Sequence, residues 1–432
     1  MRSVNLKTVI QNLSPLGLGI FHIGLVYTLY QLLVIGTFIH SFDIYHFKQW
    51  DANWYAKIAK DGYCFSETDQ SSVAFFPLFP FVWKVLWKLF DAGIDQVCLF
   101  NTMMFVFGMA LLKKAFQFSW MYFLIFLSIP SCIFMYAPYA EAIFFFFSAL
   151  LLAGIKLDSK KMIVTGLFFA SLTRPAATFF IPAILAMEVL NYKDIKLFIK
   201  NIVTFILPSF IALFVVFLIH YKDTGVWLAF FLTEGWGRDF KFPEFPLTTW
   251  GGLKKLWLDG IALFFGLIST FILLIALFRK FKKPVSFTFD KAASFSLTYL
   301  MMAMCTVLFF SDKDKDGGTT LLSLNRYVMA SAYFIVFLFY FSHQVNLNLK
   351  KYGLCLFTFV VSLLLLNLNG TGYNEYTLVQ KVFYAIFMFC HIHIYLLISS
   401  KFQSKFLSGV YIINISIQLF LLSQFANGEW VG

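Results

Sequence analysis

Asp51 is the first candidate for chemistry, because it stands between Trp50 and the pair Trp54-Tyr55 directly after the first long apolar run. A carboxylate at the boundary of water and lipid can accept a proton from an attacking hydroxyl group, and this step needs no metal. The three aromatic side chains offer flat surfaces on which a ligand can stack. The alternative is that Asp51 only caps the helix that it opens.

Three further candidates lie at the ends of later apolar runs. Glu141 precedes a run of phenylalanines, where an acid usually has a partner or a function, although a helix N-terminus could also stabilise it. Arg174 precedes Pro175, which breaks a helix, and its planar guanidinium group suits a phosphate diester. The alternative is a structural arginine paired with an acid such as Glu141. Arg326 and Tyr327 open a span, where they can hold a lipid phosphate or only anchor the helix.

A weaker candidate is the segment Glu234-Gly235-Trp236-Gly237-Arg238, in which Trp236 could stack on a ligand beside Arg238. The six cysteines are scattered, and the seven histidines show no spacing typical of metal ligands. The sequence also contains no phosphate-binding loop or dinucleotide fingerprint. We therefore predict neither a metal nor a cofactor.

The elements that must position these residues are membrane helices. Hydrophobic residues make up 60% of the chain and charged residues 13%, which excludes a soluble domain of this length. The net charge of +12 is explained by basic loops between spans, so no nucleic-acid partner is expected. We predict an all-α polytopic membrane protein with a single domain, residues 1–432, and about 13 spans. The apolar runs are 17–39, 97–112, 116–136, 142–155, 162–173, 176–190, 201–220, 257–278, 294–310, 326–342, 353–367, 378–398 and 407–423.

The lysine and arginine clusters between these runs set the topology. With the N-terminus inside, all of them fall on the cytoplasmic side. The loops 40–96, 136–141, 221–256, 311–325 and 368–377 then lie outside, together with the tail around 426–430. Most acids are in these outer segments, so we expect the chemistry there.

The first outer loop, 40–96, contains two predicted surface helices. Trp50, Trp54 and Ile58 share one face of the first at intervals of four residues, beside Tyr55 and Ala59, and Lys57 and Lys60 lie on the other face. Trp83 and Trp87 repeat this spacing in the second, which favours a surface helix or a re-entrant hairpin over a span.

The chain resembles the PIG-V family, which comprises GPI mannosyltransferase II and its bacterial relatives within the GT-C glycosyltransferases. The resemblance begins with W-D-x-x-W-Y-x-x-I-A-x-x-G-Y at 50–63 and A-F-F-P-L-F-P at 74–80. It continues in the same order with A-P-Y-A-E at 137–141, L-T-R-P at 172–175, W-G-R at 236–238 and R-Y at 326–327. Ala140 replaces the hydroxyl residue that is usual at its position in the family.

The resemblance implies a GT-C-like helical bundle that transfers mannose from a polyprenyl- or dolichyl-phosphate donor to a lipid or glycan acceptor outside the cytoplasm. It implies Asp51 as catalytic base, with Glu141 also catalytic, and it implies that Arg174, Arg326 and Tyr327 bind the donor phosphate. A bacterial plasma membrane is expected rather than the endoplasmic reticulum. A lipid or solute transporter is the alternative, but it would need ionisable groups near mid-membrane.

Overall fold

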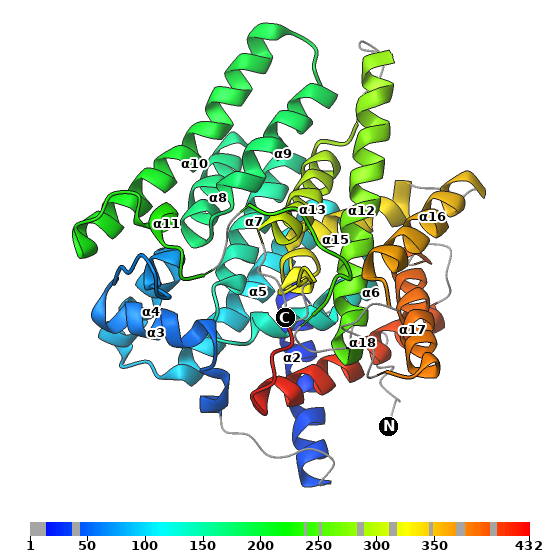
Figure 1. Ribbon diagram of the computed structural model, residues 1–432, viewed down its shortest axis with the longest axis horizontal. Coiled ribbons are helices and arrows are strands. Elements are labelled where there is room, and N and C mark those ends of the chain that lie inside the picture. Colours follow the sequence, from blue (N-terminus) through cyan, green and yellow to red (C-terminus); the bar gives the residue numbers. More distant parts are fainter. Residues whose placement is uncertain are drawn as a thin grey trace, which may run out of the picture.

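The computed structural model describes residues 14–36, 44–236, 240–249, 253–282, 289–310, 318–344, 349–368, 376–397 and 404–432. Within these ranges the chain is almost entirely helical (Figure 1). The α-helices are α2 (Pro15–Ile35), α3 (Asp51–Asp61), α4 (Leu78–Phe90), α5 (Ile94–Phe116), α6 (Trp120–Leu127), α7 (Glu141–Lys156), α8 (Lys160–Thr173), α9 (Ala177–Leu190), α10 (Ile195–Thr224), α11 (Ala229–Leu232), α12 (Leu253–Lys282), α13 (Lys291–Phe309), α14 (Leu324–Val328), α15 (Ala332–Gln344), α16 (Leu349–Leu366), α17 (Leu378–Leu397) and α18 (Ser404–Ala426). Three 3-10 helices are η1 (Ile44–Phe47), η2 (Ser72–Ala74) and η3 (Pro130–Met135).

The described ranges contain seven helices that are long and apolar enough to cross a membrane, namely α2, α5, α10, α12, α13, α17 and α18. Helices α9, α15 and α16 are apolar but shorter. The chain is therefore an integral membrane protein, and the prediction of an all-α polytopic fold is confirmed. Each predicted apolar run contains a helix.

Two predicted spans are not continuous helices. The run 326–342 is divided, because α14 ends at Val328 and α15 begins at Ala332. The run 116–136 is broken, because α6 ends at Leu127 and a separate 3-10 helix begins at Pro130. Proline lacks a backbone N–H and keeps the preceding residue out of the helical region, and Ile129 is accordingly extended. The chain thus turns within the protein, and η3 is buried throughout.

The segments predicted to share one side of the membrane contact one another. On the basic side, Lys280 Nζ lies 3.2 Å from the carbonyl oxygen of Tyr192. On the other side, the amide of Glu234 donates to the carbonyl of Glu67, and the amide of Tyr63 donates to Asp223. Figure 1 shows the α9–α10 connection and the end of α12 at the top, with α3 and α4 at the lower left. Which side faces the cytoplasm stays a prediction.

We expect a membrane-impermeant maleimide added outside the cell to label Cys64, which is exposed. Partial burial raises the pKa of this thiol, but hydrogen bonding with Ser72 and the charge of Lys57 outweigh it, so that the pKa is lowered. Because the thiolate is the reactive form, labelling should proceed near neutral pH. The measurement uses a Cys390→Ser background. A Lys160→Cys control that lacks Cys64 should react only after permeabilisation, and the opposite pattern would contradict the predicted topology.

The two predicted surface helices are α3 and α4, and the second is a helix rather than a hairpin. They lie together at one edge of the molecule (Figure 1). Tyr55 of α3 packs edge-on against Phe79 of α4, with ring centroids 4.9 Å apart. The buried face of α3 consists of Ala52, Tyr55, Ile58 and Ala59, of which the last three belong to the predicted apolar face, whereas Trp50 is exposed.

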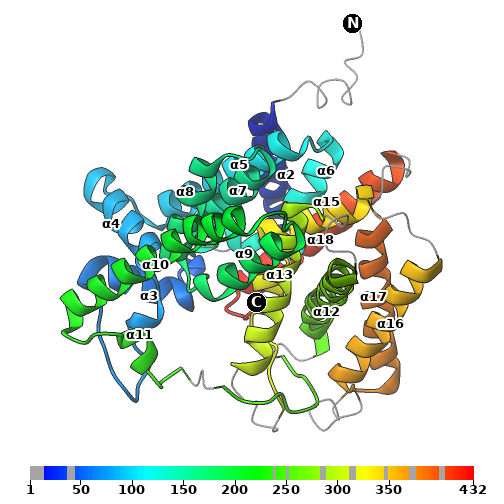
Figure 2. The same ribbon diagram turned by 90° about the horizontal axis from the view of Figure 1, so that it is seen from above.

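Helix α12 stands in the middle of the later helices. Figure 2 looks nearly along its axis and shows α13, α16 and α17 around it. Residues 255–260 of this helix are buried, and the C-terminal end of the chain lies near the centre of the molecule in both views. The start of α12 is therefore placed beside the residues described next.

Candidate active site

Four of the predicted residues come from distant segments and form one group of charges. Arg326 Nη2 lies 2.6 Å from Oδ2 of Asp51. Its Nε donates to Oε1 of Glu141, and the same oxygen lies 3.2 Å from Nη1 of Arg174. We call these four residues, Asp51, Glu141, Arg174 and Arg326, the charge cluster.

Exposure distinguishes the members of the charge cluster. The side chain of Asp51 is 26% exposed and that of Arg174 is 13% exposed, whereas Arg326 is 3% and Glu141 1% exposed. A ligand can therefore reach Asp51 and Arg174 more easily than the other two. Glu141 holds both guanidinium groups, so the structural alternative for Arg174, a pair with Glu141, is present. The second carboxylate oxygen of Glu141 has no hydrogen-bond partner among the described residues.

Asp51 is the first residue of α3, but it does not cap the helix. The N-cap is Trp50, and no side chain makes a cap hydrogen bond there. Trp50 adopts a φ of 51°, a left-handed conformation that is strained for a bulky residue. The carboxylate of Asp51 pairs with Arg326 instead, which contradicts the interpretation of Asp51 as a helix cap alone.

The sequence around Glu141 and Arg174 explains their placement. Glu141 opens α7, where the helix dipole favours a negative charge. The turn before it is fixed by Asn101, whose amide nitrogen donates to the carbonyls of Ala137 and Tyr139. Arg174 ends α8 in an extended conformation, as expected for a residue before proline.

Aromatic rings cover the faces of both guanidinium groups. The Cζ atom of Arg326 lies 4.9 Å from the ring centroid of Tyr139, 5.3 Å from that of Phe134 and 5.6 Å from that of Trp430. The Cζ atom of Arg174 lies 4.6 Å from the ring centroid of Tyr327. Tyr327 thus joins the site by stacking on an arginine.

The guanidinium group of Arg326 stays positively charged. Burial disfavours the charged guanidinium group, but Glu141 and Asp51 outweigh it and keep the pKa of Arg326 well above its ordinary value. Burial and the neighbouring Asp51 also raise the pKa of Tyr55 far above its ordinary value. The site therefore keeps a permanent cation beside a neutral phenol.

Asp259 is a site residue that the sequence reasoning missed. This buried acid of α12 accepts hydrogen bonds from the Thr249 hydroxyl and from the backbone and side-chain nitrogens of Asn325. Asn325 also accepts a hydrogen bond from Ser131 of η3. Because Asn325 directly precedes Arg326, this network fixes the segment that carries the arginine. An acid inside an apolar run is a functional signal that could have revealed it.

Trp430 is a second residue that the sequence did not single out. It reaches Arg326 from the far end of the chain, and its carbonyl accepts a hydrogen bond from Lys255 of α12 at 2.6 Å. Lys255 also pairs with Glu429 at 3.1 Å. No local pattern in the sequence indicates these contacts.

Trp54, Tyr55 and Trp236, three of the remaining predicted ligand-binding residues, each pack against Phe75. Trp54 stacks on Phe75 and meets Trp236 edge-on, with ring centroids 5.6 Å apart. The indole nitrogen of Trp236 donates to the carbonyl of Ser71. Trp236 therefore lies against the first outer loop and packs with aromatic side chains of that loop. Arg238 lies outside the described residues.

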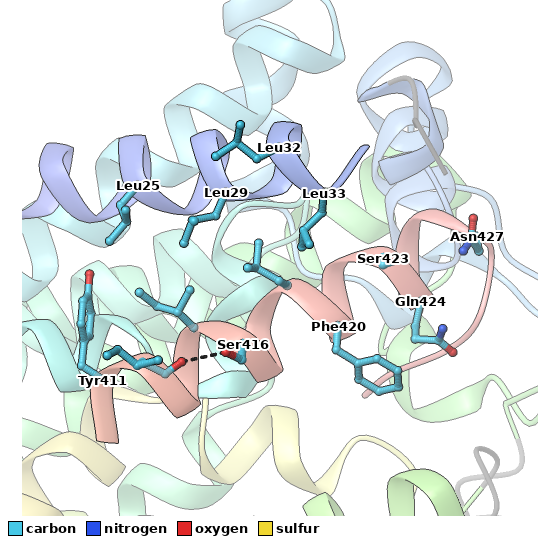
Figure 3. A pocket seen from close by; sticks show the side chains of 13 residues that line it. Leu25, Leu29, Leu32, Leu33, Tyr411, Ser416, Phe420, Ser423, Gln424 and Asn427 are labelled. Carbon is cyan, nitrogen blue, oxygen red and sulfur yellow. Dashed lines mark hydrogen bonds between the residues drawn. The ribbon is translucent and has the colours of Figure 1, made fainter. Parts of the chain in front are cut away.

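An apolar groove of about 1070 Å³ runs between α2 and α18. Figure 3 shows Leu25, Leu29 and Leu33 of α2 facing α18, with Tyr411 at one end of the groove and Asn427 at the other. Both helices are long enough to span a membrane. The Asn427 end is close to the charge cluster, because the Gln49 side chain donates to the carbonyl of Phe425 and the Gln49 carbonyl accepts from Tyr139.

No protein-family model matches the chain, and no curated protein sequence is significantly similar to it. The crystal structure of ArnT from Cupriavidus metallidurans bound to undecaprenyl phosphate is similar over 95% of this chain and 77% of that chain, with 11% identity and a TM-score of 0.46. Because identity and superposition are both low, we assign function from this chain's own residues.

Proposed function

We propose that the protein is a polyprenyl-phosphate-dependent glycosyltransferase of the GT-C type that acts outside the cytoplasm. The observation that carries the proposal is the charge cluster, in which an accessible acid is paired with one of two arginines. The resemblance of the segments around these residues to the PIG-V family supports mannose as the sugar. The four residues come from four of the segments that carry this resemblance.

The proposed reaction is a direct displacement at the anomeric carbon. The acceptor hydroxyl forms the new bond to this carbon and gives its proton to Asp51. The bond to the phosphate oxygen breaks, and its electron pair leaves with the phosphate. Arg174 and Arg326 suit the charge that the phosphate gains, because guanidinium groups bind phosphate oxygens through paired hydrogen bonds. One displacement inverts the anomeric configuration, so a β-linked donor gives an α-linked product.

The net charge of the charge cluster sets the order in which donor binding and proton transfer occur. The two acids and two arginines of the charge cluster cancel. The phosphate diester of a bound donor adds a negative charge, so it must compete with Asp51 for Arg326. Arg326 keeps its bond to Glu141 during this exchange. Asp51 is then released as a free base only when the donor is in place.

The groove between α2 and α18 suits the hydrocarbon chain of the donor. It is lined mainly by leucine, isoleucine and phenylalanine, and its Asn427 end is near Gln49, two residues before Asp51. A lipid chain lying there would bring its phosphate to the charge cluster from within the membrane.

Purified protein incubated with polyprenyl-phosphate mannose and a mixed lipid and glycan acceptor fraction should consume the donor and release polyprenyl phosphate. Mass spectrometry of the lipid extract measures both. A transporter would move the lipid without cleaving it. If the donor stays intact with every acceptor fraction, while the protein still moves the lipid between the leaflets of vesicles, the transporter is favoured instead.

Replacing Arg174 by Gln should weaken donor binding by about tenfold or more, because a charged hydrogen bond is lost from the accessible side of the charge cluster. Arg174→Lys should weaken it less, since an ammonium group keeps the charge but not the planar fork. The dissociation constant of polyprenyl phosphate for protein in nanodiscs measures both effects. Arg279→Gln, at the exposed far end of α12, is the matched control. Equal affinity of the Arg174 and Arg279 variants would remove Arg174 from the donor site.

A further inference from the structure

Residues 427–432, which we call the closing segment, are held against Arg326 of the charge cluster by contacts with α12. Lys255 donates to the carbonyl of Trp430 and pairs with Glu429. Val431 is buried, and the last residue, Gly432, lies against Phe134. These contacts fix the backbone on both sides of Trp430.

The ring of Trp430 contacts Arg326 on one side and Trp50 on the other. Its centroid lies 5.6 Å from Cζ of Arg326 and 5.5 Å from the ring centroid of Trp50, the residue before Asp51. Its indole nitrogen is buried and has no hydrogen-bond partner among the described residues. The contribution of Trp430 within the described part of the chain therefore comes from its ring.

We propose that Trp430 is a positioning residue that keeps Arg326 in place for the donor phosphate when the ion pair between Asp51 and Arg326 breaks. This proposal rests on the function proposed above. The Trp430 ring covers one face of the Arg326 guanidinium group. The N–H groups at the edge of the guanidinium group stay available for hydrogen bonds. A cation on an aromatic face is stabilised, and excluding water strengthens its pairing with an incoming anion. Without the ring, Arg326 would keep only Glu141 and two of its three covering rings.

The first test measures the binding of polyprenyl phosphate, without a sugar, to full-length protein in nanodiscs. Trp430→Ala should raise the dissociation constant about tenfold, which lies within the range expected for a largely buried cation–π contact. Trp430→Phe keeps a ring and loses no hydrogen bond made within the described residues, so its affinity should stay within about threefold of the original. Trp87→Ala, which removes an exposed tryptophan of α4, is the matched control and should have no effect.

The second test asks whether the effect of the closing segment on phosphate binding depends on its contacts with Lys255. In protein with Val431→Cys, peptide mass spectrometry should find residue 431 protected from maleimide. Adding Lys255→Met should expose residue 431 to maleimide. It should also weaken the binding of polyprenyl phosphate as much as Trp430→Ala does.

The outcomes separate the two proposals. If the unaltered protein does not bind polyprenyl phosphate, the proposed function and this inference both fail. If it binds but Trp430→Ala binds equally well, or if Trp430→Phe is as weak as Trp430→Ala, only the positioning role of the ring is overturned.

Discussion

Sugar transfer by the Asp51→Asn variant should be slower by about a hundredfold or more, the usual cost of a missing general base. Donor binding should be unchanged or tighter, because the carboxylate that competes with the phosphate for Arg326 is gone. Asparagine has nearly the same size, and Asp51 makes no cap hydrogen bond that the change would disturb. Single-turnover rates and the dissociation constant of polyprenyl phosphate measure the two effects separately.

Asp61→Asn is the matched control for this variant. Asp61 is the last residue of the same helix and is exposed, so its replacement should leave both the rate and the affinity unchanged. Near-normal turnover of Asp51→Asn in protein of normal stability would pass the role of base to Glu141. Weaker donor binding by Asp51→Asn would contradict the competition for Arg326.

The Glu141→Gln variant should lose both stability and donor binding. Glu141 is buried and holds two guanidinium groups through one oxygen. An amide cannot balance their charges, and removing one partner of a buried ion pair typically costs about 3–5 kcal/mol. The temperature of unfolding in detergent should therefore fall, and binding of polyprenyl phosphate should weaken because Arg174 and Arg326 are no longer held together.

Glu188→Gln is the matched control for the effect of burial. Glu188 is also a buried glutamate, on α9, but its partner Asn201 is neutral, so the amide should be tolerated far better. Equal unfolding temperatures for the two variants would show that the charges around Glu141 contribute nothing to stability.

The sequence indicated Glu141, Arg174 and Arg326 because each lies at the boundary of an apolar run. It indicated Asp51 because this acid stands among aromatic residues after the first run. Arg174 stands before a proline and Glu141 before a row of phenylalanines, so their isolation could be read without knowing any contact. Hydrophobic runs likewise predicted the helices. The break at Pro130 was missed because the surrounding residues are apolar on both sides, and hydropathy alone does not report a change of direction.

Of the supporting residues, Asp259 lies inside an apolar run and could have been predicted in the same way, whereas Trp430 could not. Asp259 matters because Asn325 donates two hydrogen bonds to it, and Trp430 matters because Lys255 holds it over Arg326. These are contacts between distant segments, and neither leaves a periodic pattern in the sequence. The apolar face of α3 was predicted in large part, since Tyr55, Ile58 and Ala59 are buried, whereas Trp50 at its edge is exposed.

The distances along the chain within the charge cluster bear on how the protein matures. Arg326 pairs with residues that precede it by 185 and 275 positions. During synthesis, Asp51, Glu141 and Arg174 are made and inserted long before Arg326, and Trp430 follows last. Closing such long loops is slow compared with forming local helices. A growing chain therefore carries Asp51 without the partner that restrains it until residue 326 has been made, and the charge cluster can form only after that point.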